Sequence, residues 1–220
     1  AAAVLAAQLP PPAEAACGDE AALRTAIIDM MNDASFDHGS VAPRTLRYTF
    51  HASGHFDESL VPIGGSNGAS IRLEPERGYD ENRGFDHVRD RLQEIADAHA
   101  ECSTADVFVL AGYLAVETMS GPVIEFCPGR IDFPLGSGAT NCPMAGRLPR
   151  EDYGPAELRH TFGLMGADDR DIVALIGAHS TGYTHPDISG FPNVPWVDTP
   201  FTFDNKFFEW LLLDDWQHRT

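Results

Sequence analysis

The sequence predicts an all-α protein, and three features of the chain support this fold class. Several segments repeat apolar residues every three or four positions, which is the spacing of one face of an α-helix. Little of the chain alternates apolar and polar residues as a half-buried strand would. The intervening segments are long and rich in glycine and proline. A helical domain with long loops is consistent with a cofactor in its core.

The composition limits the classes of protein that fit this chain. Its 220 residues suffice for one large domain or two small lobes that share a core. No window approaches about eighteen consecutive apolar residues, so no transmembrane helix is expected. The net charge of −18, from 33 acidic against 15 basic residues, repels phosphate backbones and argues against nucleic-acid binding.

The start of the chain differs from the rest. Residues 1–18 are rich in alanine and proline and contain no lysine or arginine, whereas residues 19–220 form the expected domain. The segment Ala13–Ala15 has the small–any–small form of a signal cleavage site, and the chain does not start with Met. We expect this arm to be either the remnant of a targeting segment or a disordered extension, on a processed or incomplete product.

The expected helices follow one another along the chain. They run from Asp19 or Glu20 to about Asn32, from Pro43 to about Ser53, from Asn82 to about Ala100, through Val107–Val116, from Pro155 to Met165, from Asp168 to Ala178 and from Phe203 to Leu213. Ser103 and Asp106 have the spacing of a capping box, and Gly121-Pro122 should stop the helix that follows it. The stretches 126–153 and 181–200 are expected to be loops.

Four cysteines allow three complete disulfide pairings, and they are Cys17, Cys102, Cys127 and Cys142. None belongs to a C-x-x-C unit, so a structural zinc site is not expected. In an oxidising compartment, Cys127 and Cys142 could staple the loop between them, and Cys17 and Cys102 could tie two helix starts together. In a reducing compartment all four would be small, partly buried thiols.

Arg47 and His51 are the first candidate functional residues. On a helix, residues four apart lie on one face, so these two side chains should project together. A neutral imidazole can take a proton from one oxygen of a peroxide and return it to the other. A guanidinium can stabilise the negative charge on the departing oxygen. The spacing alone is common, and a surface arginine beside a packed histidine also accounts for it.

His179 is the second candidate, at the end of the apolar run that begins at Asp171. Gly177 and Ala178 allow close approach, and an imidazole at a helix end can face a flat cofactor. Histidine is a standard axial ligand of haem iron. A core histidine at a helix end explains the pattern equally well.

Taken together and in order, these clusters resemble the plant, fungal and bacterial haem peroxidase superfamily, and most closely its class I group of cytochrome c and ascorbate peroxidases. The matching runs are LRYTFHASGHFD, GGSNGASIRLEPE, ENRGF, TADVFVLAGYLAVETMSGP, FCPGRIDF, GRLPRED, LRHTFGLMGADDRDIVALIGAHSTG, SGFPNVPW and FTFDNKFFEWLLLDDW. They extend from about residue 20 to residue 216. The resemblance implies two helical lobes that enclose haem b, and reduction of hydrogen peroxide by an unidentified electron donor.

The resemblance also implies roles for individual residues. His51 corresponds to the acid/base and Arg47 to the charge stabiliser on the peroxide side of the haem, and Asn82 to the residue that orients His51. The other correspondences are Phe50 over the porphyrin, His179 as the iron ligand, His185 near the haem propionates and Trp196 beside the iron ligand.

Three departures from the family pattern modify these expectations. Ala52 replaces the aspartate that helps secreted peroxidases bind calcium, so no calcium site is expected. Ile188 stands where ascorbate peroxidases have the arginine that binds ascorbate, which argues against that mode of binding. Tyr183 stands where a basic residue usually contacts a propionate, so haem anchoring could be weaker.

The C-terminal part of the chain also departs from the family. In the family, a later helix supplies an aspartate that accepts the N–H of the iron-ligating histidine. The chain ends at Thr220, before such a helix, and no aspartate in it aligns with that residue. We therefore expect a domain that lacks the C-terminal helices, or a longer protein.

Two functions remain open on this sequence, beside a haem-binding sensor or carrier without turnover, which would gain nothing from an Arg–His pair. The first is a haem peroxidase. The alternative is a structural or accessory subunit of a larger assembly with the peroxidase fold, for which an Ala/Pro-rich arm and an acidic surface would be suitable. The start of the chain and the resemblance indicate an organelle, with a plastid or thylakoid lumen as the first expectation and the mitochondrion as the second.

Overall fold

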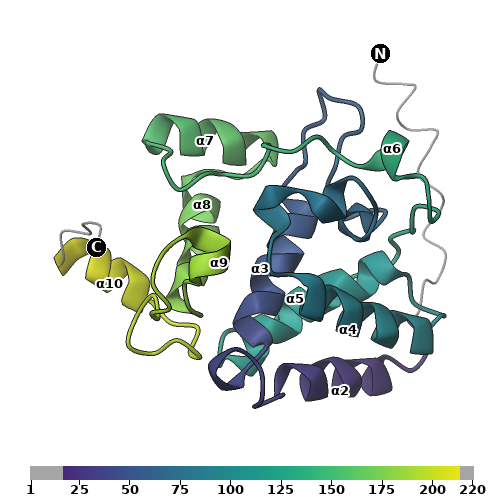
Figure 1. Cartoon of the computed structure of the whole chain (residues 1–220), viewed down its shortest axis with the longest axis horizontal. Helices are drawn as coiled ribbons and strands as arrows, with labels where there is room; N and C mark the ends of the chain where they lie inside the picture. The colour runs from purple at the N-terminus through teal and green to yellow at the C-terminus, as the bar shows by residue number, and fades with distance from the viewer. Residues whose placement is uncertain (1–16, 214–220) are drawn as a thin grey trace.

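In a computed structural model, residues 17–213 are described and form a helical protein (Figure 1). The α-helices are α2 (Glu20–Met31), α3 (Ala42–Ser53), α4 (Asp86–Ala98), α5 (Thr104–Thr118), α6 (Gly138–Asn141), α7 (Pro155–Leu164), α8 (Asp169–Ile176), α9 (Pro186–Ser189) and α10 (Lys206–Leu213). The 3-10 turns are η1 (Asp37–Gly39), η2 (Ser70–Arg72), η3 (Glu76–Gly78), η4 (Asp80–Asn82) and η5 (Gly177–Ser180). Extended pairing within 17–213 is limited to isolated bridges, so the predicted all-α class is confirmed.

The helices form two groups that meet beside α3. Helices α2 to α5 lie on one side and α7 to α10 on the other (Figure 1), and His185, at the start of α9, contacts Arg44 of α3. Helix α5 is buried along most of its length and packs against α2, α3 and α4. In this core Tyr48 of α3 makes edge contacts with Phe85 and Phe108, at ring separations of 5.3 and 5.1 Å. The core thus fixes α3, the helix that carries Arg47 and His51.

The prediction of a helix from Asn82 to Ala100 is wrong at its start. Asn82 ends the short turn η4, and α4 begins only at Asp86. Gly84 lies between them with a φ of 80°, a left-handed conformation that breaks the helical path. Periodicity alone does not show this break, because Phe85 continues the apolar rhythm of α4. The break leaves the side chain of Asn82 outside the helix and close to α3.

The last two predicted helices also begin or end elsewhere. Helix α8 starts with a full capping box between Asp168 and Asp171 but ends at Ile176, so His179 lies in the 3-10 turn η5 instead of an α-helix. Helix α10 begins at Lys206, not at Phe203. It packs against η5 and therefore against the turn that carries His179.

The predicted capping box at the start of α5 is formed on one side. Ser103 accepts a hydrogen bond from the amide of Asp106, at 3.1 Å. The carboxylate of Asp106 accepts instead from the amide of Gly129, at 2.7 Å, and from the Arg130 guanidinium, at 2.9 Å. This aspartate is 2% exposed. It therefore fastens the loop after α5 to the helix start.

The same loop returns a cap to α5. Asp132 accepts hydrogen bonds from the amides of Thr104 and Ala105, both at 2.8 Å. These amides belong to the first turn of the helix, where they have no acceptor within the helix, and the negative charge suits the positive end of the helix dipole. Loop 129–132 and the start of α5 thus satisfy each other's polar groups.

One of the possible cysteine pairs is present. Cys17 and Cys102 form a disulfide that ties the start of α2 to the start of α5, whereas Cys127 is exposed and Cys142 is buried, both as free thiols. The loop between residues 127 and 142 is therefore not stapled by a disulfide in this structure.

We expect replacement of Cys102 by serine to lower the free energy of unfolding by about 2–4 kcal/mol. The disulfide closes a loop of 85 residues, and opening it frees the unfolded chain. Urea denaturation followed by circular dichroism measures the change. Replacement of the exposed Cys127 by serine is the matched control and should leave stability unaltered; equal midpoints for both variants would contradict the prediction.

Helix length and composition also bear on membranes. Among the helices within residues 17–213, none combines the length and apolar character needed to cross a bilayer. The Ala/Pro-rich arm predicted for residues 1–18 falls almost wholly outside the described residues.

Candidate active site

Helix α3 presents Arg47 and His51 one turn apart, as their spacing predicts. The Arg47 guanidinium donates hydrogen bonds to the backbone carbonyls of Glu81, at 3.1 Å, and Arg83, at 3.3 Å. Its central carbon also lies 4.4 Å from the centre of the Phe85 ring, a cation–π contact. Two carbonyls and an aromatic face therefore hold the positive charge in place.

Asn82 fixes the orientation of His51. The amide nitrogen of Asn82 donates to the Glu76 carbonyl, at 2.9 Å, so its amide oxygen must face His51. The distance from that oxygen to His51 Nδ1 is 3.0 Å. Because this oxygen can only accept, Nδ1 of His51 carries the proton. His51 Nε2 is therefore left as an unprotonated, basic atom.

The surroundings keep His51 neutral and Arg47 charged. Burial lowers the pKa of His51 well below its ordinary value, and the charges of Arg47 and, to a smaller extent, His55 lower it further against the opposing hydrogen bond to Asn82. Burial also lowers the pKa of Arg47 to about 10, with a contribution from Arg44. At neutral pH the helix thus presents a base next to a cation.

His179 forms a second centre in η5. Its Nδ1 donates to the carbonyl of Ile176, at 3.0 Å, which leaves Nε2 available as a ligand. The ring of Trp196 lies 4.8 Å away at an angle of 75°, and that of Phe207 lies 5.2 Å away. Burial lowers the pKa of His179 against the opposing hydrogen bond to Ile176, and the charge of Arg47 lowers it further. The two centres therefore lie close enough to interact electrostatically.

Phe50 lies beside the Arg–His pair. Its ring centre is 6.4 Å from that of His51 and 6.2 Å from that of Phe162, which comes from α7. Helices α3 and α7 thus contribute neighbouring aromatic rings. Asn82, Arg47, His51 and Phe50 are brought together by the structure, and Trp196 is brought to His179.

His185 is not part of either group and lies in a separate polar cluster. Its Nε2 is 2.6 Å from Asp37 Oδ1 and 2.8 Å from a nitrogen of Arg44. Arg44 also pairs with the other oxygen of Asp37, at 2.9 Å. Since a carboxylate only accepts and a guanidinium only donates, the shorter contact assigns the Nε2 proton of His185 to Asp37.

The two departures at Tyr183 and Ile188 lie next to this cluster. The ring of His38 stacks on Tyr183 with centres 4.0 Å apart, so a histidine from η1 stands close to the position where the family has a basic residue. Ile188 packs against Gly84, where an added Cβ would meet its Cδ1 at 2.3 Å. Its side chain is thus packed against the backbone between η4 and α4.

Sequence reasoning missed several residues of these sites. Phe85 and Phe207 contact the two candidate histidines, and Asp37, His38 and Arg44 surround His185 and Tyr183. Phe85 stands in the run ENRGF and Phe207 in FTFDNKFFEW, but both read as core residues there. The contacts of Asp37 and His38 join segments far apart in sequence, for which the chain gives no local signal.

The structure is therefore that of a helical protein with two candidate centres: an Arg–His pair on α3, and a histidine beside a tryptophan in η5. The chain belongs to the peroxidase family, because residues 25–217 match the model of the family described as "Peroxidase".

Similar proteins are found among fungi. The chain is 40% identical over 207 residues to a protein of Gibberella zeae and 41% identical over 203 residues to one of Pyricularia oryzae, both named as presumed haem-binding peroxidases. These matches cover 94% and 92% of this chain, and 61% and 66% of the two relatives. It is also 40% identical over 190 residues to the mitochondrial cytochrome c peroxidase of Emericella nidulans, covering 86% of this chain and 51% of the relative. The chain thus spans about three fifths of the length of the first two curated relatives.

Proposed function

We propose that this protein is a haem-dependent peroxidase that reduces hydrogen peroxide to water. The observation that carries the proposal is the hydrogen bond between His51 and Asn82, with Arg47 held one helical turn away by the backbone carbonyls of segment 81–83. A neutral, oriented imidazole beside a fixed guanidinium is suited to breaking a peroxide bond. Membership of the peroxidase family supports the same function.

The residues present fit haem b as a cofactor. His179 has a free Nε2 because its Nδ1 is bonded to Ile176, and a neutral imidazole with one free nitrogen is a standard ligand of haem iron. Trp196 would lie beside this ligand, and Phe50 on the side of the Arg–His pair. The names of the fungal relatives describe haem-binding proteins, in agreement with this donor set.

His51 would move the proton in the reaction. When bound, haem supplies the two electrons that the breaking O–O bond requires. His51 Nε2 takes the proton from one oxygen of hydrogen peroxide and returns it to the other, which leaves as water. Asn82 keeps Nδ1 protonated throughout, so Nε2 remains the atom that exchanges the proton.

Arg47 would stabilise the departing oxygen. Its guanidinium remains charged at neutral pH and is held by carbonyls of residues 81 and 83. A fixed cation stabilises negative charge as it develops without reorganising, which is the main source of such catalysis. No other proton donor is needed, because the proton removed from one oxygen is delivered to the other.

Absorption spectroscopy tests the proposal. The purified chain, produced with an adequate haem supply, should show a Soret band that shifts within seconds of adding an equimolar amount of hydrogen peroxide. A colourless protein that takes up no added haem would overturn the proposal.

The rate of reaction with peroxide should depend on pH through His51. Only the neutral imidazole can accept the proton, so the rate constant should fall as the pH drops through the pKa of His51. Because that pKa is lowered, we expect the rate to stay constant from neutrality to below pH ~6.5, the ordinary value for histidine. In Arg47→Gln the fall should begin at higher pH, because a charge that lowers the pKa is lost. Stopped-flow measurements across pH check both expectations; an identical acid limb in the two proteins would contradict them.

We further propose a mitochondrial location, which rests on relatives named as mitochondrial cytochrome c peroxidases in Emericella nidulans and, as a presumed enzyme, Yarrowia lipolytica. These comparisons give no support to the plastid expected from the sequence.

The electron donor is a small molecule or a protein. Ile188, which packs on Gly84, offers no positive charge that could bind ascorbate in the way the arginine of ascorbate peroxidases does. None of the relatives named here is described as an accessory subunit.

A further inference from the structure

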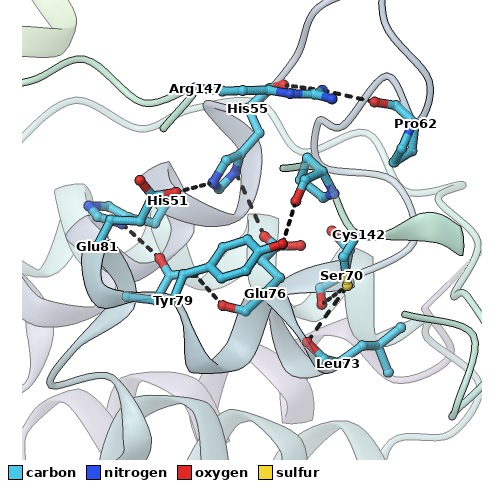
Figure 2. Close-up of polar contacts among 12 residues, drawn as sticks. His51, His55, Pro62, Ser70, Leu73, Glu76, Tyr79, Glu81, Cys142 and Arg147 are labelled. Carbon is cyan, nitrogen blue, oxygen red and sulfur yellow. Dashed lines mark hydrogen bonds and ion pairs between the residues drawn. The ribbon is translucent and has the colours of Figure 1, made fainter. Parts of the chain in front are cut away.

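A buried histidine lies behind the Arg–His pair and belongs to none of the predicted site residues. His55 follows the C-terminal end of α3 and is 1% exposed. Its Nε2 lies 3.3 Å from Glu81 Oε1, and its Nδ1 lies 3.7 Å from Glu76 Oε1 (Figure 2). Glu76 is 0% exposed, and Glu81 is partly buried. One imidazole thus sits between two carboxylates inside the protein.

The backbones of these two glutamates hold the residues proposed for peroxide cleavage. The carbonyl of Glu76 accepts the side-chain N–H of Asn82, and the carbonyl of Glu81 accepts the guanidinium of Arg47. The side-chain oxygen of Asn82 in turn accepts a hydrogen bond from Nδ1 of His51. The side chains of the glutamates therefore contact His55, while their main chains set the positions of Asn82 and Arg47.

We propose that His55 is a positioning residue, which pins segment 76–82 against the end of α3 and thereby holds Asn82 and Arg47 in place. The contacts of His55 add to the hydrogen bonds that already join α3 to this segment, in which η3 and η4 are single turns without side-chain caps. A displacement of this segment by a fraction of an ångström would alter the hydrogen bond between Asn82 and His51. The catalytic aspect of the inference rests on the proposed peroxidase function.

The charges around His55 favour this role. Burial raises the pKa of Glu76, and the charge of His55 opposes that rise. Burial also disfavours the charged form of Glu81, but hydrogen bonds from His55 and from the Gly146 amide outweigh it and lower the pKa of Glu81. His55 is thus the group that the two carboxyl groups share, and its interactions lower the pKa of each against the effect of burial.

The remaining neighbours form a cover over the cluster. The Arg147 guanidinium donates to the backbone carbonyl of His55, at 3.3 Å, and to that of Pro62, at 2.8 Å (Figure 2). The thiol of Cys142 lies beside Glu76. The titratable or charged groups that face His55 are thus Glu76, Glu81, Arg147 and, along α3, His51, whose pKa the charge of His55 lowers.

The first experiment measures the pKa of His51 by NMR titration of histidine side chains in the full chain without added haem. In His55→Gln, the pKa of His51 should rise, because one of the charges that lowers it is lost. The matched control is His99→Gln, which removes a comparable pair at the C-terminal end of α4, His99 Nδ1 to Glu101 Oε1 at 3.7 Å. Unchanged His51 titration in His55→Gln would overturn the proposal.

The second experiment separates the ion pair from the main-chain contacts. Glu81→Gln keeps the carbonyl that holds Arg47 but removes the charge that pairs with His55, and it serves if His55→Gln does not fold. We expect both variants to react with hydrogen peroxide about 10-fold more slowly at unaltered haem affinity, in the range typical of lost supporting hydrogen bonds. Equal rates in wild type and both variants would overturn the positioning role.

The two readouts distinguish this inference from the proposed function. If the wild-type chain does not react with peroxide, the peroxidase proposal fails, but the titration of His51 still reports on His55. If the wild type reacts and the His55→Gln and Glu81→Gln variants match it in both measurements, the peroxidase proposal stands and the positioning role is excluded.

Discussion

Replacement of His51 by leucine should slow the reaction with hydrogen peroxide by about 10²–10⁴-fold, the usual contribution of a general acid–base group. The variant keeps Arg47, but no group remains with a free, oriented basic nitrogen at this point of α3. Without it, the proton of the attacking oxygen must pass to water, and the leaving oxygen departs without one. Stopped-flow absorbance at several peroxide concentrations gives the second-order rate constant.

The leucine variant needs two checks. Circular dichroism should show an unaltered helix content, because His51 is not part of the main core. His160→Leu, at an exposed position of α7, is the matched control and should react as the wild type does. A His51→Leu rate within a few-fold of wild type would show that the Arg–His pair does not carry the reaction.

Replacement of His179 by glycine should abolish tight haem binding. We expect the dissociation constant to rise by more than about 100-fold, because even groups that only orient a metal ligand contribute 10–100-fold to affinity. Trp196 and Phe207 line the site but offer no nitrogen lone pair that could replace the imidazole. Titration of the protein with haem, followed at the Soret band, measures the change.

Added imidazole provides the complementary test. A small ring that enters the space left by the His179 side chain should restore part of the absorption, since Nε2 is the only ligand atom lost. His51→Leu is the internal control, because it retains His179 and should bind haem as tightly as wild type. If His179→Gly bound haem normally and His51→Leu did not, the assignments of the two histidines would be reversed.

The sequence predicted the architecture well where local rules decide it. Helix α2 and helix α3 begin and end close to the predicted residues, because Asp19 caps the first and Pro43 occupies the first turn of the second. The fold class needed only periodicity and loop composition. The predicted start of α4 is wrong because Phe85 continues the apolar spacing of the helix, whereas the backbone turns at Gly84. The spacing of apolar side chains does not show where a single residue adopts a left-handed backbone conformation.

The candidate site was predictable to a similar extent. The projection of Arg47 and His51 together follows from a spacing of four on a helix. The pairing of Asn82 with His51 came from the family resemblance, because nothing local to residue 82 points to it. The role inferred for His55 required the structure, since its partners come from two separate turns. Contacts between distant segments depend on the whole fold.

The reciprocal bonds between α5 and loop 129–132 have a consequence for local unfolding. If this loop separated from the rest of the protein, the carboxylate of Asp106 would lose its donors and the first amides of α5 would lose their acceptor, Asp132. Opening the loop therefore costs much of the free energy that unfolding the first turn of α5 costs. Although it is an irregular loop that starts with Gly129, the segment should exchange its amide hydrogens together with the core, as part of one cooperative unit.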